Sequence, residues 1–238
     1  MLRAALFLAL LPGLAQAACR DITFEDAPYT VCEVSAGADL RLFLQGPDGN
    51  LGSFGAVNDL LAGDGLALTF AMNAGMYHAD RAPVGLYIAD GVQVAPIVTS
   101  DGPGNFGLLP NGVFCIGGSF AVIEARSFAA NPPACRYATQ SGPMLVIDGA
   151  LHPRFLPGSD SNNIRYGVGV TADGTAIFAI SGTRVNFHSF ARLFRDVLAT
   201  PNALFLDGSI SRLYAPALGR NDQGFPMGPI VGLVGAGN

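Results

Sequence analysis

Four groups of polar residues stand where an apolar run gives way to a loop, and their side chains could do chemistry if the fold brought them together. The leading members are the carboxyl of Asp207, the guanidinium of Arg165, the amide of Asn73 and the hydroxyl of Ser141. A carboxylate can serve as a base or a nucleophile, and a guanidinium binds phosphate through paired hydrogen bonds. Side chains at strand ends can converge on one cleft, so these four residues form our candidate site.

The Asp207 carboxylate has a plain alternative role, because Asp-Gly is typical of tight turns. The sequence holds seven such pairs, which begin at Asp48, Asp64, Asp90, Asp101, Asp148, Asp173 and Asp207. The pairs at Asp90 and Asp173 precede apolar runs that read as the return strands of hairpins. After Asp207 and Gly208 comes Ser-Ile-Ser-Arg instead. Both interpretations, site and turn, stay open for Asp207.

The amino-acid composition excludes some kinds of catalytic chemistry and some classes of binding partner. All 13 basic residues are arginine, which excludes a lysine nucleophile or Schiff base and leaves guanidinium groups as the strong phosphate binders. The net charge of −5 argues against a nucleic-acid partner, because phosphate backbones need a basic surface. The sequence has no G-x-S-x-G motif, no P-loop and no H-E-x-x-H motif, so the common hydrolase and nucleotide signatures give no lead.

The four cysteines are Cys19, Cys32, Cys115 and Cys135, and an even number in an exported chain predicts disulfides. Three pairings are possible, of which we favour the local one, 19 with 32 and 115 with 135. Each bond is expected to stabilise the fold by about 3 kcal/mol. No two cysteines have C-x-x-C spacing and the three histidines are scattered, so we expect neither a metal site nor a cofactor.

The first 17 residues have the features of a secretory signal peptide. Arg3 precedes an apolar run, and Ala15-Gln16-Ala17 is a small-x-small cleavage site. We therefore expect cleavage after Ala17, a periplasmic or secreted product, and one domain over residues 18–238. No later apolar run approaches the length of a membrane span.

Short apolar runs broken by glycine dominate the rest of the sequence. Hairpins are expected around the turns at 90–91, 117–118 and 173–174, and helices are expected over residues 53–61 and 187–198, with Ser53 and Asn186 as N-caps. The glycine- and proline-rich tail 224–238 is expected to form a final edge strand. The fold class that follows is α+β, with a largely antiparallel curved sheet and two or more packed helices.

Five motifs in order resemble the phosphodiester glycosidase family over residues 40–234. They are "NAGMY" at 73–77, "PVGLYIADG" at 83–91, "SGPMLVIDG" at 141–149, "IRYGVGVTADG" at 164–174 and "LDGSIS" at 206–211. The resemblance implies one pocket lined by Asn73, Gly75, Arg165, Asp207, Gly208 and Ser209 or Ser211. Ser141 and Gly142, which begin the third motif, and His78, which follows the first, are further candidates. Ser209 and Ile210 stand where the family usually has glycines, and Met76-Tyr77 replaces its usual Phe.

The resemblance implies hydrolysis of a bond between an anomeric carbon and a phosphate. Phosphate leaves as a stable anion, so one carboxylate can suffice where a sugar–sugar bond needs two. Asp207 is the expected base or nucleophile and Arg165 the expected phosphate clamp. Asn73 would hold a sugar hydroxyl, and the backbone amides of Gly208 and Ser209 would face an oxyanion.

Several alternatives stay open beside this reading. Arg165 could form a structural ion pair, Asn73 a left-handed cap near Gly75, and His78 a surface position rather than an acid or base. Asp80 is a candidate second carboxylate. The whole protein could be a non-catalytic glycan- or glycan-phosphate-binding protein on the same fold, or a metal-dependent phosphodiesterase that uses Asp207 and nearby acids.

Overall fold

The computed structural model describes residues 17–207 and 210–237. Over these residues the strands form three antiparallel sheets and a small separate hairpin. The seven-stranded sheet has the order β1 (Ala18–Phe24), β2 (Ala27–Val34), β15 (Ala176–Ser181), β14 (Tyr166–Val170), β16 (Asn202–Asp207), β12 (Met144–Ile147), β13 (Ala150–Leu151). One five-stranded sheet has the order β10 (Phe120–Glu124), β9 (Gly112–Ile116), β11 (Tyr137–Ser141), β7 (Tyr87–Ala89), β8 (Val92–Ala95). The other has the order β18 (Arg220–Asn221), β17 (Leu213–Ala215), β6 (Leu66–Asn73), β19 (Ile230–Ala236), β3 (Leu40–Phe43), and β4 (Gln45–Gly46) pairs with β5 (Gly49–Asn50).

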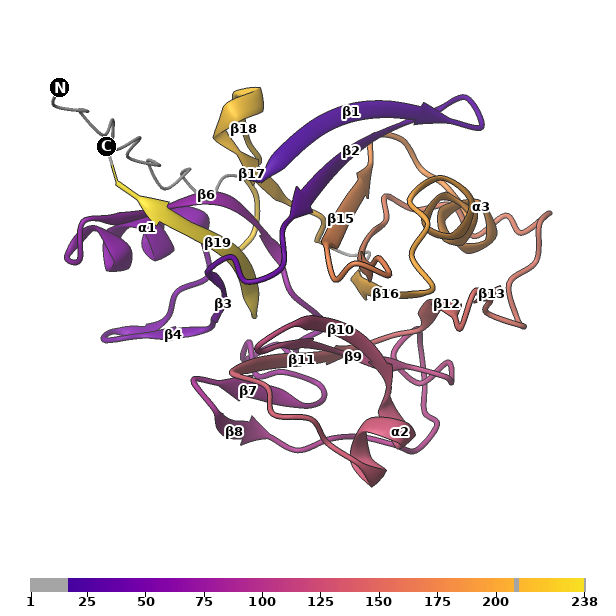
Figure 1. The fold of residues 1–238 in the computed structure, drawn as a ribbon, viewed down its shortest axis with the longest axis horizontal. Coiled ribbons are helices and arrows are strands. Elements are labelled where there is room, and N and C mark those ends of the chain that lie inside the picture. The colour runs from indigo at the N-terminus through magenta and orange to yellow at the C-terminus, as the bar shows by residue number, and fades with distance from the viewer. Residues whose placement is uncertain (1–16, 208–209, 238) are drawn as a thin grey trace, which may run out of the picture.

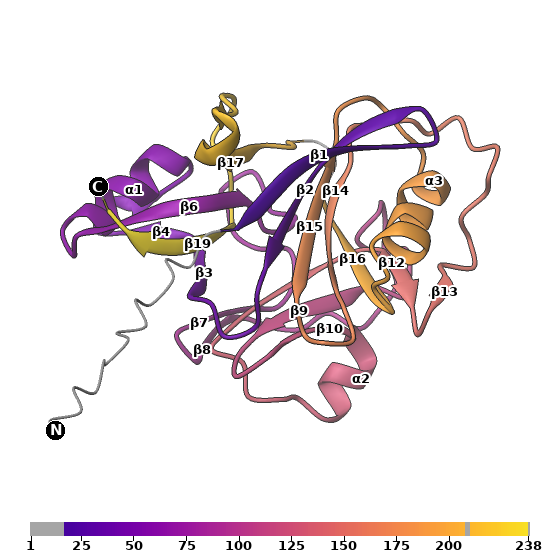
Figure 2. The same ribbon diagram turned by 45° about the horizontal axis from the view of Figure 1, so that its top comes forward.

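The helices lie outside the sheets. They are α1 (Phe54–Ala62), α2 (Ala125–Ala130), α3 (Phe187–Arg192), a π-helical continuation of α3 (Leu193–Val197) and a 3-10 turn (Pro216–Leu218). Figures 1 and 2 show α1 beside β6 and β19, and α3 beside β12 and β16. The predicted α+β class is thus confirmed, although the strands divide among three sheets.

The predicted hairpins form because their turn residues adopt the backbone that such turns need. Asp90 and Gly91 have φ of 47° and 78° between β7 and β8, which suits a two-residue turn of the primed type. The β9–β10 and β14–β15 pairs also form as antiparallel neighbours. Both predicted N-caps are confirmed: the side chains of Ser53 and Asn186 accept the backbone N–H three residues on.

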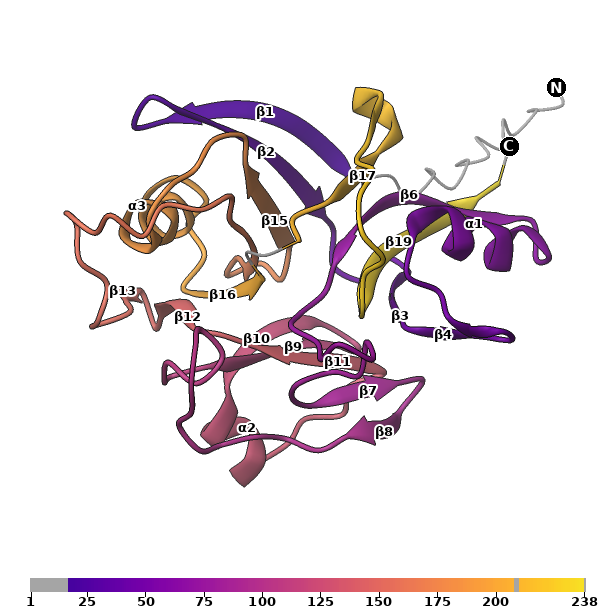
Figure 3. The same cartoon turned by 180° about the vertical axis from the view of Figure 1, so that it is seen from behind.

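The predicted edge position of the C-terminal strand is wrong. β19 is an interior strand that pairs with β6 on one side and β3 on the other, as the view from behind also shows (Figure 3). Glycine makes this possible, since a Cβ at Gly232 would lie 2.4 Å from Leu68 Cδ2. The sequence suggested an edge because glycine and proline weaken isolated strands, whereas here close packing needs the missing side chain.

Three phenylalanines from three sheets meet in the main core. Phe70 of β6 lies 4.9 Å from Phe178 of β15, measured between ring centroids, and Phe178 lies 5.8 Å from Phe114 of β9 in an edge-to-face arrangement. All three side chains are buried. Aromatic pairs of this geometry contribute about 1 kcal/mol each beyond the burial of their area. The sheets therefore share one core, and a single domain over residues 18–238 stays our prediction.

The favoured disulfide pairing is confirmed. Cys19 bonds to Cys32 across the β1–β2 pair, and Cys115 of β9 bonds to Cys135 before β11. The predicted signal peptide lies at residues 1–17, almost wholly outside the described residues. Across the described residues no helix has the length and apolar character to cross a bilayer.

Removal of the second disulfide should be measurable. Cys115→Ala with Cys135→Ala is expected to lower the free energy of unfolding by about 3 kcal/mol, since the unfolded chain gains freedom. Guanidinium denaturation of the oxidised protein measures this. The Cys19→Ala, Cys32→Ala pair is the matched comparison and should cost slightly less, because its separation is 13 residues instead of 20. A loss under about 1 kcal/mol in both variants would contradict the chain-entropy argument.

Candidate active site

Asp207 ends a buried interior strand. β16 runs between β14 and β12, and Asp207 pairs in register with Tyr166. The next described strand, β17, pairs with β6 and β18 instead of returning along β16. Asp207 therefore does not sit in the turn of a hairpin, and that alternative is contradicted. Only 8% of Asp207 is exposed, an unusual position for a carboxylate.

A cavity of about 350 Å³ opens at Asp207. Its other lining residues are Met76, Tyr77, Arg81, Val84 and Ile210. The wall thus combines a carboxylate, a guanidinium and a phenol with three apolar side chains. Small-molecule sites have this character, with a few placed polar groups on an apolar surface.

Asn73 links three parts of the chain behind this cavity. It is fully buried at the end of β6, and its amide nitrogen donates to the Tyr166 hydroxyl and to the carbonyl of Ile210. Its amide oxygen accepts the backbone N–H of Arg212 at 3.2 Å. Asn73 is not among the residues with a left-handed backbone, whereas Gly75 has φ of 148°. The cap alternative is therefore contradicted, and Asn73 holds Ile210 and Arg212 against β14.

Two phenols lie within the electrostatic reach of Asp207. Burial raises the pKa of Tyr166 well above its usual value, and the Asp207 carboxylate raises it further. The pKa of Tyr77 is raised by the same two causes, with burial the larger. Both groups are therefore protonated at neutral pH and can act as hydrogen-bond donors. Neither tyrosine is among the site residues that the sequence predicts, although Tyr166 lies in the motif "IRYGVGV" and Tyr77 in "NAGMY".

Other predicted residues shape the backbone around the site. The Ser141 hydroxyl donates to the carbonyl of Leu206 at 2.6 Å, directly before Asp207. A Cβ at Gly75 would lie 2.9 Å from the Thr139 hydroxyl, and a Cβ at Gly142 would lie 2.6 Å from Asn111 Cβ. These contacts bring β11, β16 and the end of β6 together. The Ser141 hydroxyl therefore has a structural role as a hydrogen-bond donor. At Gly75 and Gly142 the backbone lies so close to neighbouring atoms that a side chain would not fit.

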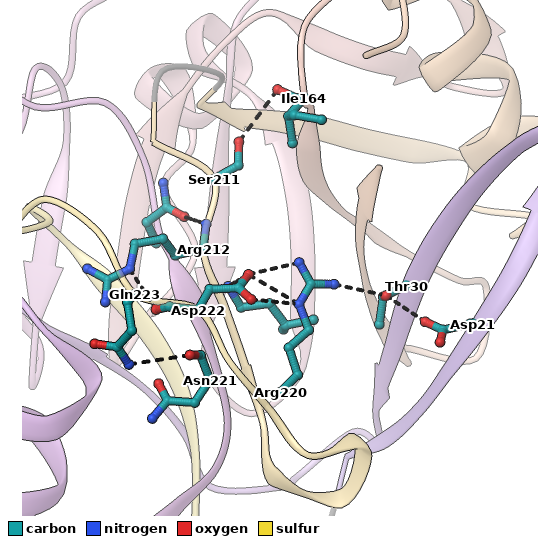
Figure 4. Close-up of polar contacts among 11 residues, drawn as sticks. Asp21, Thr30, Ile164, Ser211, Arg212, Arg220, Asn221, Asp222 and Gln223 are labelled. Atoms are coloured by element: carbon teal, nitrogen blue, oxygen red, sulfur yellow. Dashed lines mark hydrogen bonds and ion pairs between the residues drawn. The ribbon is translucent and has the colours of Figure 1, made fainter. Parts of the chain in front are cut away.

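The segment after residue 209 is held by a second polar network. Ser211 donates to the carbonyl of Ile164 at 3.5 Å, and Arg212 Nε donates to the carbonyl of Asp222 at 2.9 Å. Arg220 pairs with Asp222 at 2.8 Å and donates to Thr30 of β2 at 3.0 Å. Figure 4 shows a chain of contacts from Arg212 through Asp222, Arg220 and Thr30 to Asp21, with the Ser211–Ile164 bond separate from it. Gly208 and Ser209 lie outside the described residues.

Arg165 faces a different environment from its neighbour Tyr166. Its Nε donates to the carbonyl of Val185 at 2.9 Å and its Nη2 to that of Ser161 at 2.7 Å. The guanidinium carbon lies 3.5 Å from the ring centroid of Phe187, which is a cation–π contact. Burial lowers the pKa of Arg165 to about 10. Neither the ion pairs of the described residues nor the lining of the 350 Å³ cavity includes Arg165.

His78 and Asp80 lie on the surface. Both are exposed in the loop 77–83, and Asp80 accepts the backbone N–H of Ala82 at 3.0 Å. The cavity lining includes neither of them, but it includes Arg81 from the same loop. Within residues 17–207 and 210–237, no cluster of three or more His, Cys, Asp or Glu side chains could hold a metal ion.

Comparison with known proteins shows which family the chain matches. The phosphodiester glycosidase family model matches residues 67–226. An uncharacterized protein of Escherichia coli K12, YigE, is 35% identical over 214 residues, which cover 88% of this chain and 83% of that protein.

Solved structures share the fold at low sequence identity. The zebrafish N-acetylglucosamine-1-phosphodiester alpha-N-acetylglucosaminidase catalytic domain, auto-inhibited by its pro-peptide, has a TM-score of 0.63 at 14% identity, over 97% of this chain and 86% of that one. A putative exported protein from Burkholderia pseudomallei K96243 has a TM-score of 0.57 at 13% identity, over 87% and 74% of the two chains. From its family match and its curated relative, this chain belongs to the phosphodiester glycosidase family.

Proposed function

We propose that this protein is an exported hydrolase that cleaves a glycosyl phosphodiester, the bond between the anomeric carbon of a sugar and a phosphate. The observation that carries the proposal is the buried Asp207 carboxylate in a cavity that also presents a guanidinium. A carboxylate can attack the anomeric carbon or activate water. The phosphate monoester departs as an anion without a general acid, so the second carboxylate of ordinary glycosidases is not required.

The polar groups that bond near Asp207 position its backbone. Asn73, Tyr166 and Ser141 fix the backbone on both sides of the carboxylate. The predicted oxyanion contacts of Gly208 and Ser209 and the predicted acid–base role of His78 stay predictions. Arg165 donates to two backbone carbonyls, and its predicted contact with the phosphate also stays a prediction. The two disulfides suit an oxidising compartment, which supports a periplasmic or secreted location.

The test is hydrolysis of a hexose 1-(methyl phosphate) diester in water enriched in ¹⁸O. Cleavage at the anomeric carbon places the label in the free sugar and releases unlabelled methyl phosphate, which mass spectrometry detects. A metal-dependent phosphodiesterase would break the P–O bond and place the label in the phosphate. The expected result is unlabelled methyl phosphate, with a rate that does not change after exhaustive chelation.

One observation favours a non-catalytic carbohydrate- or glycan-phosphate-binding protein as the second candidate. Ile210 lines the cavity at a position where the family usually has glycine, so an apolar side chain occupies space that substrate would use. In that case calorimetry would detect binding of the diester, and prolonged incubation would yield no methyl phosphate. Product formation at any rate above the buffer blank excludes this candidate.

A further inference from the structure

Arg81 is a cation without a carboxylate partner among the described residues. Most arginines of the described chain are committed: some form ion pairs with Asp or Glu, and Arg165 and Arg212 donate to backbone carbonyls. Arg81 appears in no described ion pair, yet its side chain lines the cavity of Asp207. Arg81 has a side-chain hydrogen-bond interaction with Tyr77. A guanidinium carries five N–H donors, so the remaining ones suit an oxyanion.

The loop of Arg81 holds it in a conformation that a residue with a Cβ adopts only at a cost. Its φ is 74°, in the left-handed region. The loop is closed by the bridge between Tyr77 and Pro83, by the bond from His78 N to the Ala82 carbonyl at 2.8 Å, and by the bond from Arg81 N to the His78 carbonyl at 2.9 Å. Strain of this kind persists where surrounding contacts impose it, and it is concentrated at functional sites.

Tyr77 gives the Arg81 side chain a fixed surface. The guanidinium carbon of Arg81 lies 5.4 Å from the centroid of the Tyr77 ring, within cation–π range. The ring itself is packed against the backbone at Gly228, where a Cβ would lie 2.5 Å from the ring. Its hydroxyl reaches the carbonyl of Pro226 at 3.4 Å. Tyr77 is therefore positioned by backbone about 150 residues away in the sequence, and its ring in turn contacts Arg81.

The cavity needs such a cation if it is to take an anion. An ionised Asp207 carboxylate in the same cavity would repel a phosphate at short range in a partly desolvated site. A guanidinium on the same wall offsets that repulsion. The three apolar residues Met76, Val84 and Ile210 offer no competing acceptor, and they can contact the uncharged part of a phosphate ester.

We propose that Arg81, supported by the Tyr77 ring, is the phosphate subsite of this cavity and binds the tetrahedral oxyanion of a phosphate ester. The proposal deepens the proposed function and rests on it for the identity of the natural ligand. Arg81 places the phosphate beside the Asp207 carboxylate, which leaves the anomeric carbon as the atom that Asp207 faces. Arg81 is then a substrate-binding residue whose loss weakens phosphate binding directly.

The test titrates inorganic phosphate into the purified oxidised protein by calorimetry. Arg81→Gln is expected to weaken binding by at least about tenfold, the effect of one charge-assisted hydrogen-bond pair. Arg81→Lys should weaken it less, because the charge remains but the planar fork is lost. Arg184→Gln removes the same charge from an exposed arginine outside the cavity lining and should leave the affinity unchanged.

The variant Arg81→Gly tests whether a loss of phosphate affinity results from unfolding and not from the missing guanidinium. Glycine adopts a φ of 74° without strain, so this variant should melt at or above the temperature of the wild type while losing phosphate affinity as Arg81→Gln does. Equal phosphate affinity in the wild type and both variants overturns the proposal. A wild-type protein that does not bind inorganic phosphate at millimolar concentration overturns it too.

The titration also separates this proposal from the proposed function, since it needs no turnover. If phosphate binding depends on Arg81 but the protein never releases methyl phosphate, the phosphate-subsite proposal is supported and the hydrolase proposal is contradicted. If the protein hydrolyses the diester and Arg81→Gln does not change the phosphate affinity, the hydrolase proposal is supported and the phosphate-subsite proposal is contradicted.

Discussion

Asp207→Asn is expected to abolish hydrolysis of a glycosyl phosphodiester, with a loss in kcat of at least about 10³-fold. The amide has nearly the same shape as the carboxyl but can neither attack an anomeric carbon nor accept a proton from water. The folded state should survive, because β16 and its pairing with β14 do not depend on the charge. Release of methyl phosphate under single-turnover conditions measures the chemical step, and the melting temperature reports the fold.

Asp148→Asn is the matched control for this experiment. Asp148 also begins an Asp-Gly pair, and it directly follows β12 of the seven-stranded sheet, the sheet in which Asp207 ends β16. It lies in a hairpin turn with φ of 46°, and it is exposed. Asn-Gly fits the same turn, so turnover should not change. Asp207→Asn with wild-type turnover would remove Asp207 from the mechanism.

Arg165→Met is expected to give the largest loss of stability among single substitutions near the site, about 3 kcal/mol. Met fills much of the volume but cannot donate to the carbonyls of Val185 and Ser161, and it ends the contact with the Phe187 ring. The Val185 carbonyl keeps only the backbone N–H of Asn163 as a donor. In a domain of this size about 3 kcal/mol corresponds to a fall in Tm of roughly 6–12 °C. Calorimetric or fluorescence melting of the oxidised protein measures it.

The exposed Arg184 provides the comparison, since Arg184→Met should shift Tm by no more than about 2 °C. Arg165→Lys then distinguishes the structural role of Arg165 from its predicted contact with the phosphate. Lysine can satisfy one carbonyl and keeps its charge, but it cannot bind phosphate through two parallel hydrogen bonds. A Lys variant that folds and turns over normally contradicts the phosphate-clamp prediction, whereas one that folds but has a raised KM supports it.

The elements were predictable because their signals are local. The turns at Asp90 and Asp173 and the caps Ser53 and Asn186 depend on a few neighbouring residues, and the structure confirms them. The helix α2 went unpredicted because it is only six residues long, too short for a helical period to show. The position of β19 depends on partners more than a hundred residues away, which composition cannot reveal.

The candidate site was predictable only in part. The motifs identified Asn73 and Asp207, whose surroundings the structure joins through Tyr166 and Ile210. Tyr77 and Tyr166 were missed because a tyrosine in an apolar run is most often a core residue. Arg81 was missed because nothing in its own loop indicates that the loop borders Asp207. The direction of the Arg165 side chain likewise depends on where α3 packs.

The interior position of β19 sets when its sheet can close during synthesis. Thr69 of β6 hydrogen-bonds to Leu233 of β19, 164 residues later, an interval on the order of ten seconds at ordinary ribosome speeds. Until then β6 and β3 emerge without the strand that belongs between them, and unpaired edges are templates for aggregation. In the folded sheet β3 and β6 each pair with β19, so each keeps an unpaired edge until residues 230–236 have been made.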